Sequence, residues 1–439
     1  MIKQLWLLFI ACIKVQSNQF IPLSLQKKLA EKRIIKTVHH AYHTVPLYRE
    51  KYDQAGVDIN GVTCLKDLKK LPFITKDEIR ENFPDKIIAK GTDIDKCHYS
   101  ATTGSTGRSL PFLFSPETFA FYMMTSLRVY TMIGYRPWHK LVYVKYTSVE
   151  TPKFGPFFRT AHIPSTITIE EQIARLIVEK PDLLTGYASI IHEIAQKITP
   201  EQLKQLHIKF VSVNSEMSTV DQRNFISNRF DCPVYDEYST EETWMITSQC
   251  KKHNYHLFID NVWVEFLDKS GEDVNPGEVG EMVLTTTRSD VMPFIRYRIG
   301  DLGRYSDDTC ACSLGFPLIQ AFDGRSDDSF ILPSGKFVSS LKILNTFTKF
   351  IKNYLHLMEE FKVIQEEKDR IVIYLVKGRE YDDGVFKKLI DILHGIMGEP
   401  VTIDLEFVDA IDYKGSIKRK AIESRVTKPA EAMTEALAS

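Results

Sequence analysis

Short apolar runs and amphipathic segments take turns along the middle of the chain, between residues 138 and 240. The apolar runs have the length of buried strands, and the segments between them repeat apolar residues at helical spacing. This alternation predicts a parallel β-sheet covered by helices, and so an α/β fold. The expected strands are Lys140–Tyr146, Leu183–Thr185, Ile208–Val213 and Pro233–Tyr235, and the expected helices span residues 168–180, 187–198 and 219–229.

Polar residues directly follow two of these expected strands. Asn214, Ser215 and Glu216 come after one, and Asp236, Glu237 and Tyr238 after the other. Ligands bind to α/β sheets beyond the carboxyl ends of the parallel strands. Both segments are therefore candidates for a binding site.

The remaining chain predicts helices over 22–42 and 116–133 and closely spaced strands from residue 256 onward, typical of an antiparallel or barrel-like subdomain. The C-terminal pattern predicts a small α+β domain. We expect an N-terminal domain over 1–325, a mobile C-terminal domain over 326–428 and a tail over 429–439. The strands expected in these regions are His256–Ile259, Val262–Leu267, Glu281–Thr286, Phe361–Gln365, Arg370–Val376 and Val401–Phe407, with a helix over 382–397.

Composition excludes several classes of protein. The 439 residues carry a net charge of −1, which gives no electrostatic reason to expect binding to nucleic acid or to an anionic membrane surface. No apolar run reaches 18 residues, so no membrane span is expected. Residues 5–13 are apolar enough for a short signal peptide, but Lys14 interrupts them, and an N-terminal helix packed on the domain is the preferred interpretation. A cytoplasmic location follows.

Residues 100–111 read Ser-Ala-Thr-Thr-Gly-Ser-Thr-Gly-Arg-Ser-Leu-Pro. Glycines let backbone N–H groups approach a phosphate closely, and hydroxyl groups donate further hydrogen bonds. The loop is not a Walker A motif, because no Gly-Lys-Ser/Thr closes it. A polyphosphate-binding loop and a flexible linker are the two interpretations that this stretch allows on its own.

Four further motifs follow in order. They are Tyr-Asp-Glu-Tyr-Ser-Thr-Glu-Glu at 235–242, Arg-Tyr-Arg-Ile-Gly-Asp-Leu-Gly-Arg at 296–304, Gly-Arg-Ser-Asp-Asp-Ser-Phe at 324–330 and Gly-Ser-Ile-Lys-Arg-Lys at 415–420. With the 100–111 loop, this series resembles the adenylate-forming ligases. The branch that it most resembles contains phenylacetate–CoA ligase and capsule-synthesis proteins, and the resemblance covers nearly the whole chain.

The resemblance implies attack of a carboxylate on the α-phosphate of ATP, with Mg²⁺ present, followed by transfer of the acyl group to CoA, an amine or a carrier-protein thiol. Tyr238 would pack on adenine, Asp301 would accept the ribose hydroxyls on a turn permitted by Gly300, and Glu242 would hold Mg²⁺. Arg325 would contact ribose or phosphate, and Asp327 would be the hinge about which the C-terminal domain turns. The nucleotide-binding set implied is Thr102, Thr103, Gly104, Ser105, Thr106, Gly107, Asp236, Glu237, Tyr238, Asp301 and Arg325.

The chain departs from the family pattern at two positions. Glu241 replaces a threonine that usually touches the α-phosphate, and it would repel phosphate unless it turns away or shares the metal ion with Glu242. Ser416 replaces the lysine that usually reaches the α-phosphate. Lys418 and Lys414 flank it at two residues on either side, so they face the same way in an extended loop and are the candidate catalytic groups, with Lys418 favoured. An exposed basic loop without catalytic role is the competing interpretation.

Three cysteines and a histidine suggest a structural zinc ion. Cys250, His256, Cys310 and Cys312 provide enough ligands for tetrahedral Zn²⁺, with His253 as an alternative to His256. Unliganded buried thiols are the other interpretation. Four protein ligands leave no open coordination position, so a catalytic role for this ion is not expected.

Three functions remain open from the sequence. The first is an acid–thiol ligase for an aryl or apolar acid, with Tyr135, Tyr187, Ser215 and Met217 lining the pocket. The second is an adenylyltransferase that leaves AMP on a hydroxyl group. The third is a catalytically weakened nucleotide-binding protein, suggested by Ser416 and Glu241. The identity of the acid and of the acceptor is open, and a homodimer is possible.

Overall fold

The computed structural model describes residues 2–101, 110–146, 156–325, 328–353, 357–378, 382–413 and 420–426. The chain divides into two compact units, each made of two stretches of sequence. Unit 1 comprises Met1–Gly134 and Glu237–Ala321, and unit 2 comprises Tyr135–Asp236 and Phe322–Ser439. The domain boundary predicted between residues 325 and 326 stays a prediction.

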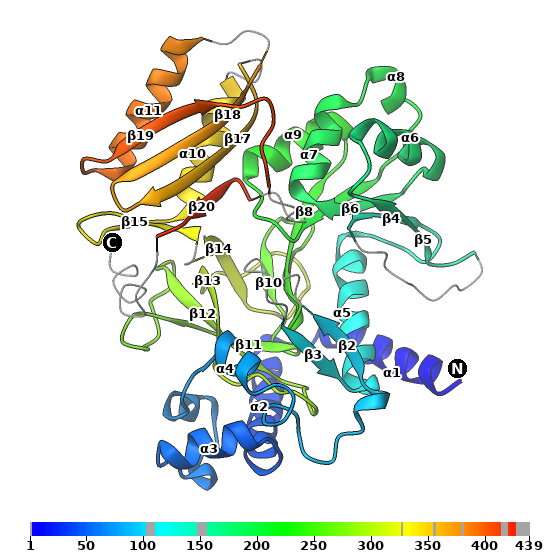
Figure 1. Ribbon diagram of the computed structural model, residues 1–439. Helices are drawn as coiled ribbons and strands as arrows, with labels where there is room; N and C mark the ends of the chain where they lie inside the picture. The colour runs from blue at the N-terminus through cyan, green and yellow to red at the C-terminus, as the bar shows by residue number, and fades with distance from the viewer. Residues whose placement is uncertain are drawn as a thin grey trace. The chain divides into compact units, whose positions relative to one another are not determined.

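Unit 2 contains the predicted parallel sheet, with strands in the order β8, β7, β6, β4, β5 (Figure 1). All residues of β6 and β7 are buried, as expected for central strands with helices on both faces. The strands are β4 (Lys140–Lys145), β5 (Arg159–Pro164), β6 (Leu183–Tyr187), β7 (Phe210–Asn214) and β8 (Val234–Thr240). The helices of this region are α6 (Ile169–Glu179), α7 (Ala188–Lys197), α8 (Pro200–Leu203) and α9 (Val220–Phe230).

Capping boxes fix where several of these helices begin. The Thr168 hydroxyl accepts the backbone N–H of Glu171, whose carboxylate accepts the N–H of Thr168, and Thr219 and Gln222 form the same arrangement. The apolar faces of α6, α7 and α9 pack with β4, β6 and β7 in one core. The predicted strands and helices of this region are therefore confirmed within a few residues. Strand β5 was missed because it is partly exposed and lacks an apolar run.

The N-terminal part of unit 1 is helical. The helices are α1 (Ile2–Asn18), α2 (Leu23–Thr44), α3 (Pro46–Gln54), α4 (Lys76–Glu81) and α5 (Pro116–Ile133). Short 3₁₀ helices lie at Ile59–Gly61, Leu65–Lys70 and Ile94–Lys96. Helix α5 has the predicted bounds: the Ser115 hydroxyl accepts the N–H of Thr118, and Gly134 ends the helix in the left-handed conformation. Within the described residues, no helix combines the length and the apolar character that crossing a membrane requires.

The rest of unit 1 is the antiparallel sheet that the sequence predicted. Strand β8 runs from one unit into the other, and from Glu237 it pairs with β9; the order then continues through β10, β14, β13 and β12 to β11. The bounds are β9 (Trp244–Gln249), β10 (Tyr255–Leu257), β11 (Val262–Leu267), β12 (Gly280–Thr286), β13 (Tyr297–Ser306) and β14 (Leu318–Arg325), with β1 (Ile74–Thr75) beside β13 and a separate hairpin of β2 (His98–Ala101) and β3 (Pro111–Phe114).

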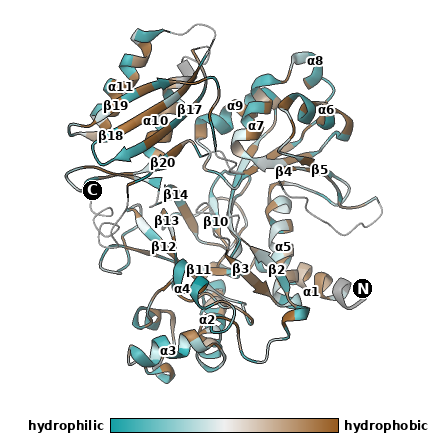
Figure 2. Cartoon of the chain, viewed as in Figure 1, coloured by the Kyte–Doolittle hydropathy of each residue, from teal (hydrophilic) through white to brown (hydrophobic). Residues whose placement is uncertain are grey.

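The C-terminal part of unit 2 is the predicted small α+β domain. Its sheet has the order β19, β18, β17, β20, and α10 and α11 pack with it in one apolar core. Figure 2 shows brown and teal residues alternating on α11, as expected of a helix with one buried face. The bounds are β15 (Phe330–Ile331), β16 (Phe337–Val338), α10 (Ser340–Asn353), β17 (Met358–Glu367), β18 (Arg370–Lys377), α11 (Asp383–Met397), β19 (Thr402–Phe407) and β20 (Ile422–Ser424).

Candidate functional site

Tyr238 and Asp301, the residues predicted to contact adenine and ribose, meet in unit 1. The Tyr238 hydroxyl donates a hydrogen bond to Asp301 Oδ2. Tyr238 lies on β8 opposite Thr247 of β9, and Asp301 lies on β13. Residues 63 positions apart in the sequence are thus brought into contact by the antiparallel sheet.

Asp301 occupies a bulge in a strand and not the predicted turn. The pairing of β12 with β13 shifts between Leu302, opposite Glu281, and Arg298, opposite Val283, so β13 has extra residues there. Gly300 has φ +81°, a left-handed conformation that glycine adopts without strain. Gly300 thus adopts an unusual backbone conformation, as expected. The chain nevertheless continues as strand β13 and does not form the predicted turn.

The two glutamates of the turn between β8 and β9 have different surroundings. Glu242 is buried, and its Oε1 accepts the Tyr297 hydroxyl at 2.9 Å. Glu241 is exposed, and its Oε2 accepts the Ser100 hydroxyl at 3.0 Å. Glu242 is therefore held in place from β13, whereas Glu241 faces the β2–β3 hairpin. Sequence reasoning missed Tyr297, although it lies within the quoted 296–304 motif.

Asp236 and Glu237 precede Tyr238 on β8. Asp236 Oδ2 accepts a hydrogen bond from Arg223 Nη1 of α9 at 3.3 Å, and both side chains are mostly buried. Glu237 is buried and lies opposite Ser248 of β9. Arg223 carried no signal in the sequence that would separate it from other helical arginines. The nucleotide contacts expected of Asp236 and Glu237 stay predictions.

The carboxyl ends of β6 and β7 bring Tyr187 and Ser215 together. Tyr187 lies opposite Asn214, whose side-chain amide donates to the Thr185 hydroxyl at 3.0 Å. The Ser215 hydroxyl donates to Asn214 Oδ1 at 2.9 Å, and Ser215 has φ +66°, unusual for a residue other than glycine. This edge is the one that the strand order predicted for ligand binding.

Glu216 and Met217 complete this segment. Glu216 Oε2 accepts the backbone N–H of Ser189 at 3.0 Å, which joins the end of β7 to the first turn of α7. Met217 packs against the apolar cluster that contains Phe330 and Leu332.

Tyr135 does not belong with Tyr187 and Ser215. Its hydroxyl donates to the carbonyl oxygen of His139 at 3.3 Å, immediately before the first residue of β4. Strands β4, β6 and β7 are parallel, so Tyr135 lies at the amino ends and Tyr187 and Ser215 lie at the carboxyl ends. Burial raises the pKa of Tyr135 to about 12. The prediction that Tyr135 lines the same pocket is therefore corrected.

Several predicted residues lie outside the described part of the chain. These are Thr102, Thr103, Gly104, Ser105, Thr106, Gly107, Asp327, Lys414 and Lys418. Next to them, Arg325 ends β14, and its carbonyl oxygen accepts the Ser329 hydroxyl at 2.8 Å. Lys420, the last residue of the 415–420 motif, forms an ion pair with Asp328.

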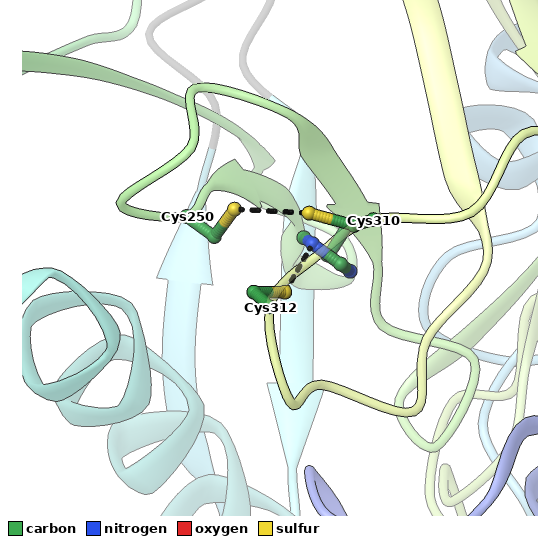
Figure 3. Close-up of side chains that lie close together, drawn as sticks. Cys250, Cys310 and Cys312 are labelled. Carbon is green, nitrogen blue, oxygen red and sulfur yellow. Dashed lines mark hydrogen bonds between the residues drawn. The ribbon is translucent and has the colours of Figure 1, made fainter.

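Cys250, His256, Cys310 and Cys312 converge in unit 1, and Figure 3 shows the three thiols facing one another. The Sγ atoms of Cys250 and Cys310 are 3.7 Å apart, and Cys312 Sγ is 3.2 Å from His256 Nε2. All four ligand atoms lie within 4.8 Å of one another. With Zn–S and Zn–N bonds of about 2.3 and 2.0 Å, ligand atoms on a tetrahedral ion are separated by roughly 3.3–3.8 Å. The geometry therefore suits zinc, and His253 is not part of the group.

The surroundings of this cluster suit metal ligands. Burial lowers the pKa of His256 to about 4, so its imidazole is neutral. Burial raises the pKa of the Cys312 thiol to about 12 in the metal-free group. The Asn254 side-chain amide donates to Cys310 Sγ at 3.2 Å, and the Lys252 backbone N–H donates to Cys250 Sγ at 3.3 Å. Such N–H donors stabilise thiolates, which are the form that binds zinc.

Comparisons with known proteins agree with these observations. A family model described as the CapK C-terminal domain matches residues 330–425. The chain is 24% identical over 329 residues to a phenylacetate-coenzyme A ligase of Thermus thermophilus, covering 71% of this chain and 73% of that enzyme. It is 26% identical over 381 residues to protein CapK of Staphylococcus aureus, covering 82% and 80%.

A crystal structure of a 2-hydroxyisobutyryl-CoA ligase in the postadenylation state superposes with a TM-score of 0.77 at 17% identity, covering 95% of this chain and 92% of that one. The fold is therefore that of the adenylate-forming ligases. The chain is similar to phenylacetate–CoA ligases and to CapK over 69–82% of its length, which agrees with the resemblance seen in the sequence.

Proposed function

We propose that this protein is an ATP-dependent ligase that activates a carboxylic acid as an acyl adenylate and then transfers the acyl group to CoA. The observation that carries the proposal is the hydrogen bond between Tyr238 and Asp301. The resemblance assigns these two side chains to the adenine and the ribose of one nucleotide, and the hydrogen bond between them supports that assignment. Similarity to phenylacetate-coenzyme A ligases over about 70% of the chain supports the proposal.

In the first half-reaction, a carboxylate oxygen of the acid attacks the α-phosphorus of ATP, and the bond to pyrophosphate breaks. Asp301 accepts the ribose hydroxyls, and Thr102–Gly107 donate hydrogen bonds to the β- and γ-phosphates. Glu242 would hold Mg²⁺, and the bound ion would neutralise phosphate charge. The hydrogen bond from Tyr297 orients Glu242 for this role. Lys418, or Lys414, supplies the positive charge at the α-phosphate that Ser416 cannot supply.

In the second half-reaction, the thiol of CoA loses its proton and attacks the acyl carbon, and the bond to AMP breaks. The C-terminal domain turns about Asp327 between the two half-reactions. Gly324 fits a hinge-adjacent position because its φ is +92° and an added Cβ would lie 2.4 Å from Ser340 Oγ. Arg325, next to it, contacts the ribose or a phosphate.

The acid binds at the carboxyl ends of β6 and β7. Tyr187, Ser215 and Met217 line the pocket, and Tyr135 is not part of it because it lies at the opposite ends of the strands. An aromatic residue beside small and flexible ones suits an aryl or apolar acid. The substrates named for the relatives, phenylacetate and CoA, are compatible with this chemistry.

A carboxylate-dependent exchange of labelled pyrophosphate into ATP tests the first half-reaction. A panel of aryl and apolar acids should include at least one that supports exchange, and adding CoA should then give the thioester, detected by mass spectrometry. Asp301→Asn should abolish most of the exchange, whereas Glu406→Gln, an exposed change on β19, should not affect it. Absence of exchange with every acid, while the protein binds ATP, would refute the ligase.

The same mass spectra address the alternatives left open by the sequence. AMP retained on the product would indicate an adenylyltransferase, and nucleotide binding without turnover would indicate a weakened homologue. The CoA ligases among the relatives and structural neighbours favour neither. An amine or a carrier-protein thiol as acceptor, a homodimer and a cytoplasmic location stay predictions.

We further propose that Cys250, His256, Cys310 and Cys312 bind a structural Zn²⁺ ion. The distances between the ligand atoms and the mixed thiol–imidazole donor set support this. Elemental analysis of protein purified without added metal should find about one zinc per chain. Cys310→Ser should lose the ion, and Cys97→Ser, outside the cluster, should retain it. Zinc-free protein whose three cluster thiols are reduced and whose stability is unchanged would refute this assignment.

A further inference from the structure

Large apolar side chains are exposed at the N-terminus far more densely than elsewhere. Of the fifteen exposed large apolar side chains in the described chain, six lie between residues 6 and 25: Trp6, Phe9, Ile13, Phe20, Leu23 and Leu25. Trp6 is 59% exposed and Phe9 57%, and their rings stack with centroids 6.0 Å apart. Contiguous exposed apolar side chains of this kind mark an interaction surface.

Helix α1 has two apolar faces. Ala11 and Val15 are buried, and α1 packs beside α5 within unit 1. Trp6, Phe9 and Ile13 follow one another at spacings of three and four residues, so they form a single stripe on the exposed side. Helix α1 is mostly pale to brown in Figure 2. The buried face accounts for the packing of α1, and the exposed stripe is left without an intramolecular role.

Positive charge accompanies these apolar residues. Residues 1–44 contain seven lysines and arginines and one acid, a net charge of +6, although the whole chain carries −1. The charge is therefore distributed unevenly along the chain, because residues 45–439 together carry −7 although the net charge of the whole chain is close to zero. The total charge alone therefore does not exclude binding of the N-terminal region to an anionic surface.

The cations of α2 face solvent. Lys27, Lys28, Lys32 and Lys36 are exposed, and none of them has an ion-pair partner in the part of the chain that the structure describes. Lys28, Lys32 and Lys36 repeat every four residues, on the same side as Leu25. Glu31, the one acid of this region, is engaged by the backbone N–H of Leu65 at 3.1 Å.

The corner between α1 and α2 is held rigidly. The backbone N–H groups of Phe20 and Ile21 donate to Ser17 and Asn18, and the Gly315 N–H donates to the Gln19 carbonyl oxygen at 2.8 Å. The Asn18 side chain donates to buried Asp260 at 2.9 Å. Neither helix can easily rotate its exposed apolar residues inward, so the surface is preformed.

We propose that this N-terminal surface, formed by Trp6, Phe9, Ile13, Phe20, Leu23 and Leu25 with Lys14, Lys27, Lys28, Lys32 and Lys36, binds the protein to anionic lipid membranes at the interface. Aromatic and aliphatic side chains enter the boundary between headgroups and acyl chains, and lysines bind anionic headgroups. A second copy of the chain fits less well, because two such surfaces, each with five lysines, repel each other. The inference does not depend on the ligase activity.

Vesicle flotation tests it. Full-length protein should float with phosphatidylcholine vesicles that contain one third phosphatidylglycerol. It should bind vesicles of pure phosphatidylcholine at least tenfold more weakly, and high salt should release it from the anionic vesicles. The fluorescence of Trp6 should shift to shorter wavelength on binding. Trp6→Gln with Phe9→Gln should weaken binding at least tenfold. Lys28→Gln with Lys32→Gln should weaken it by roughly tenfold or more, because each lysine near the surface contributes about fivefold.

Trp138→Gln is the matched control, because Trp138 is also 59% exposed but lies outside this surface. It should bind vesicles like the wild type, and circular dichroism should show all variants folded. Equal binding by Trp6→Gln/Phe9→Gln and the wild type would overturn the proposal. A wild-type protein that does not float with the vesicles would also overturn it, whether sedimentation analysis finds a monomer or a dimer formed through α1.

Discussion

The buried carboxylate of Asp260 should be one of the most sensitive positions for the stability of unit 1. Arg128 binds both of its oxygens, with Nη1 2.9 Å from Oδ2 and Nη2 3.1 Å from Oδ1, and both side chains are fully buried. The Asn18 amide adds a third hydrogen bond to the carboxylate. The guanidinium also lies 4.1 Å above the ring of Phe258. In Asp260→Asn, the cation stays in this dry site without its counter-charge.

The expected loss is about 3–5 kcal/mol of unfolding free energy, the cost of leaving one charge of a buried pair uncompensated. Two charge-assisted hydrogen bonds at about 1.5–3 kcal/mol each give a similar figure. Arg370 and Asp404 provide the control, because their N–O distance is also 2.9 Å while their side chains are 48% and 39% exposed. Asp404→Asn should cost about 0–1 kcal/mol.

Urea unfolding followed by tryptophan fluorescence and circular dichroism measures both variants. A chain with two units need not unfold in one step. Asp260→Asn is therefore compared with the wild type in the transition in which Trp244 and Trp263 of unit 1 become exposed, and Asp404→Asn in the circular-dichroism transition of unit 2. Asp260→Leu combined with Arg128→Met should recover much of the loss, since it removes both buried charges. Similar costs for Asp260→Asn and Asp404→Asn would refute the reasoning.

The pH dependence gives an independent check. Burial alone would raise the pKa of Asp260, but the Arg128 guanidinium, the Asn18 hydrogen bond and the charge of Arg288 together outweigh burial and hold this pKa below its ordinary value. Because the pKa of Asp260 is lower in the folded than in the unfolded protein, its carboxylate contributes fully to the free energy of unfolding above the pKa of an unfolded aspartate. This contribution is lost as the pH falls through the folded-state pKa. The stability difference between wild type and Asp260→Asn should therefore stay constant near neutral pH and narrow only in acid.

Three further predictions concern the nucleotide site, the metal cluster and the hinge region. Asp301→Asn should raise the KM for ATP by roughly 10–100-fold, because hydrogen bonds to a charged acceptor are lost. Tyr238→Phe should have a smaller effect. Equal KM values for Asp301→Asn and the wild type in steady-state assays would contradict the ribose assignment. Chelation of zinc should lower the thermal unfolding midpoint of the wild type by several degrees and leave that of Cys310→Ser unchanged, as calorimetry would show. Gly324→Ala should destabilise by about 1–3 kcal/mol in thermal melts because of its positive φ and the close Ser340 hydroxyl, whereas Gly395→Ala, with nothing within 4 Å in helix α11, should be neutral or stabilising.

The sequence predicted the elements whose ends carry local signals. Ser115, Pro116 and Gly134 mark the start and end of α5, and its bounds were predicted without error. The parallel strands were found because β6 and β7 are buried throughout. Strand β5 was missed because an edge strand is only partly covered and needs no apolar run. Local composition therefore predicts central elements better than peripheral ones.

The family motifs supplied the candidate site residues, whose roles stay predictions. The motifs led to Tyr238, Asp301 and the Cys/His cluster, which the fold brings together. The motifs did not show that Tyr135 lies away from the pocket. A residue that precedes a parallel strand lies at the amino end of that strand, and this rule alone would have excluded Tyr135. Tyr297 and Arg223 were missed because their roles depend on partners far away in the sequence.

Phe316 lies between the Cys/His cluster and the buried ion pair of Arg128 and Asp260, with contacts to both. Its carbonyl oxygen lies 3.3 Å from His256 Nδ1, and its ring lies 4.9 Å from the Arg128 guanidinium carbon. A carbonyl oxygen can only accept a hydrogen bond, so Nδ1 carries the proton and Nε2, near Cys312, keeps the lone pair that a metal ion needs. The same residue therefore selects the ligating tautomer of His256 and covers Arg128. A zinc ion that fixes His256 would thereby also hold Phe316 over the ion pair, which gives a physical reason for a closed metal site without a catalytic role.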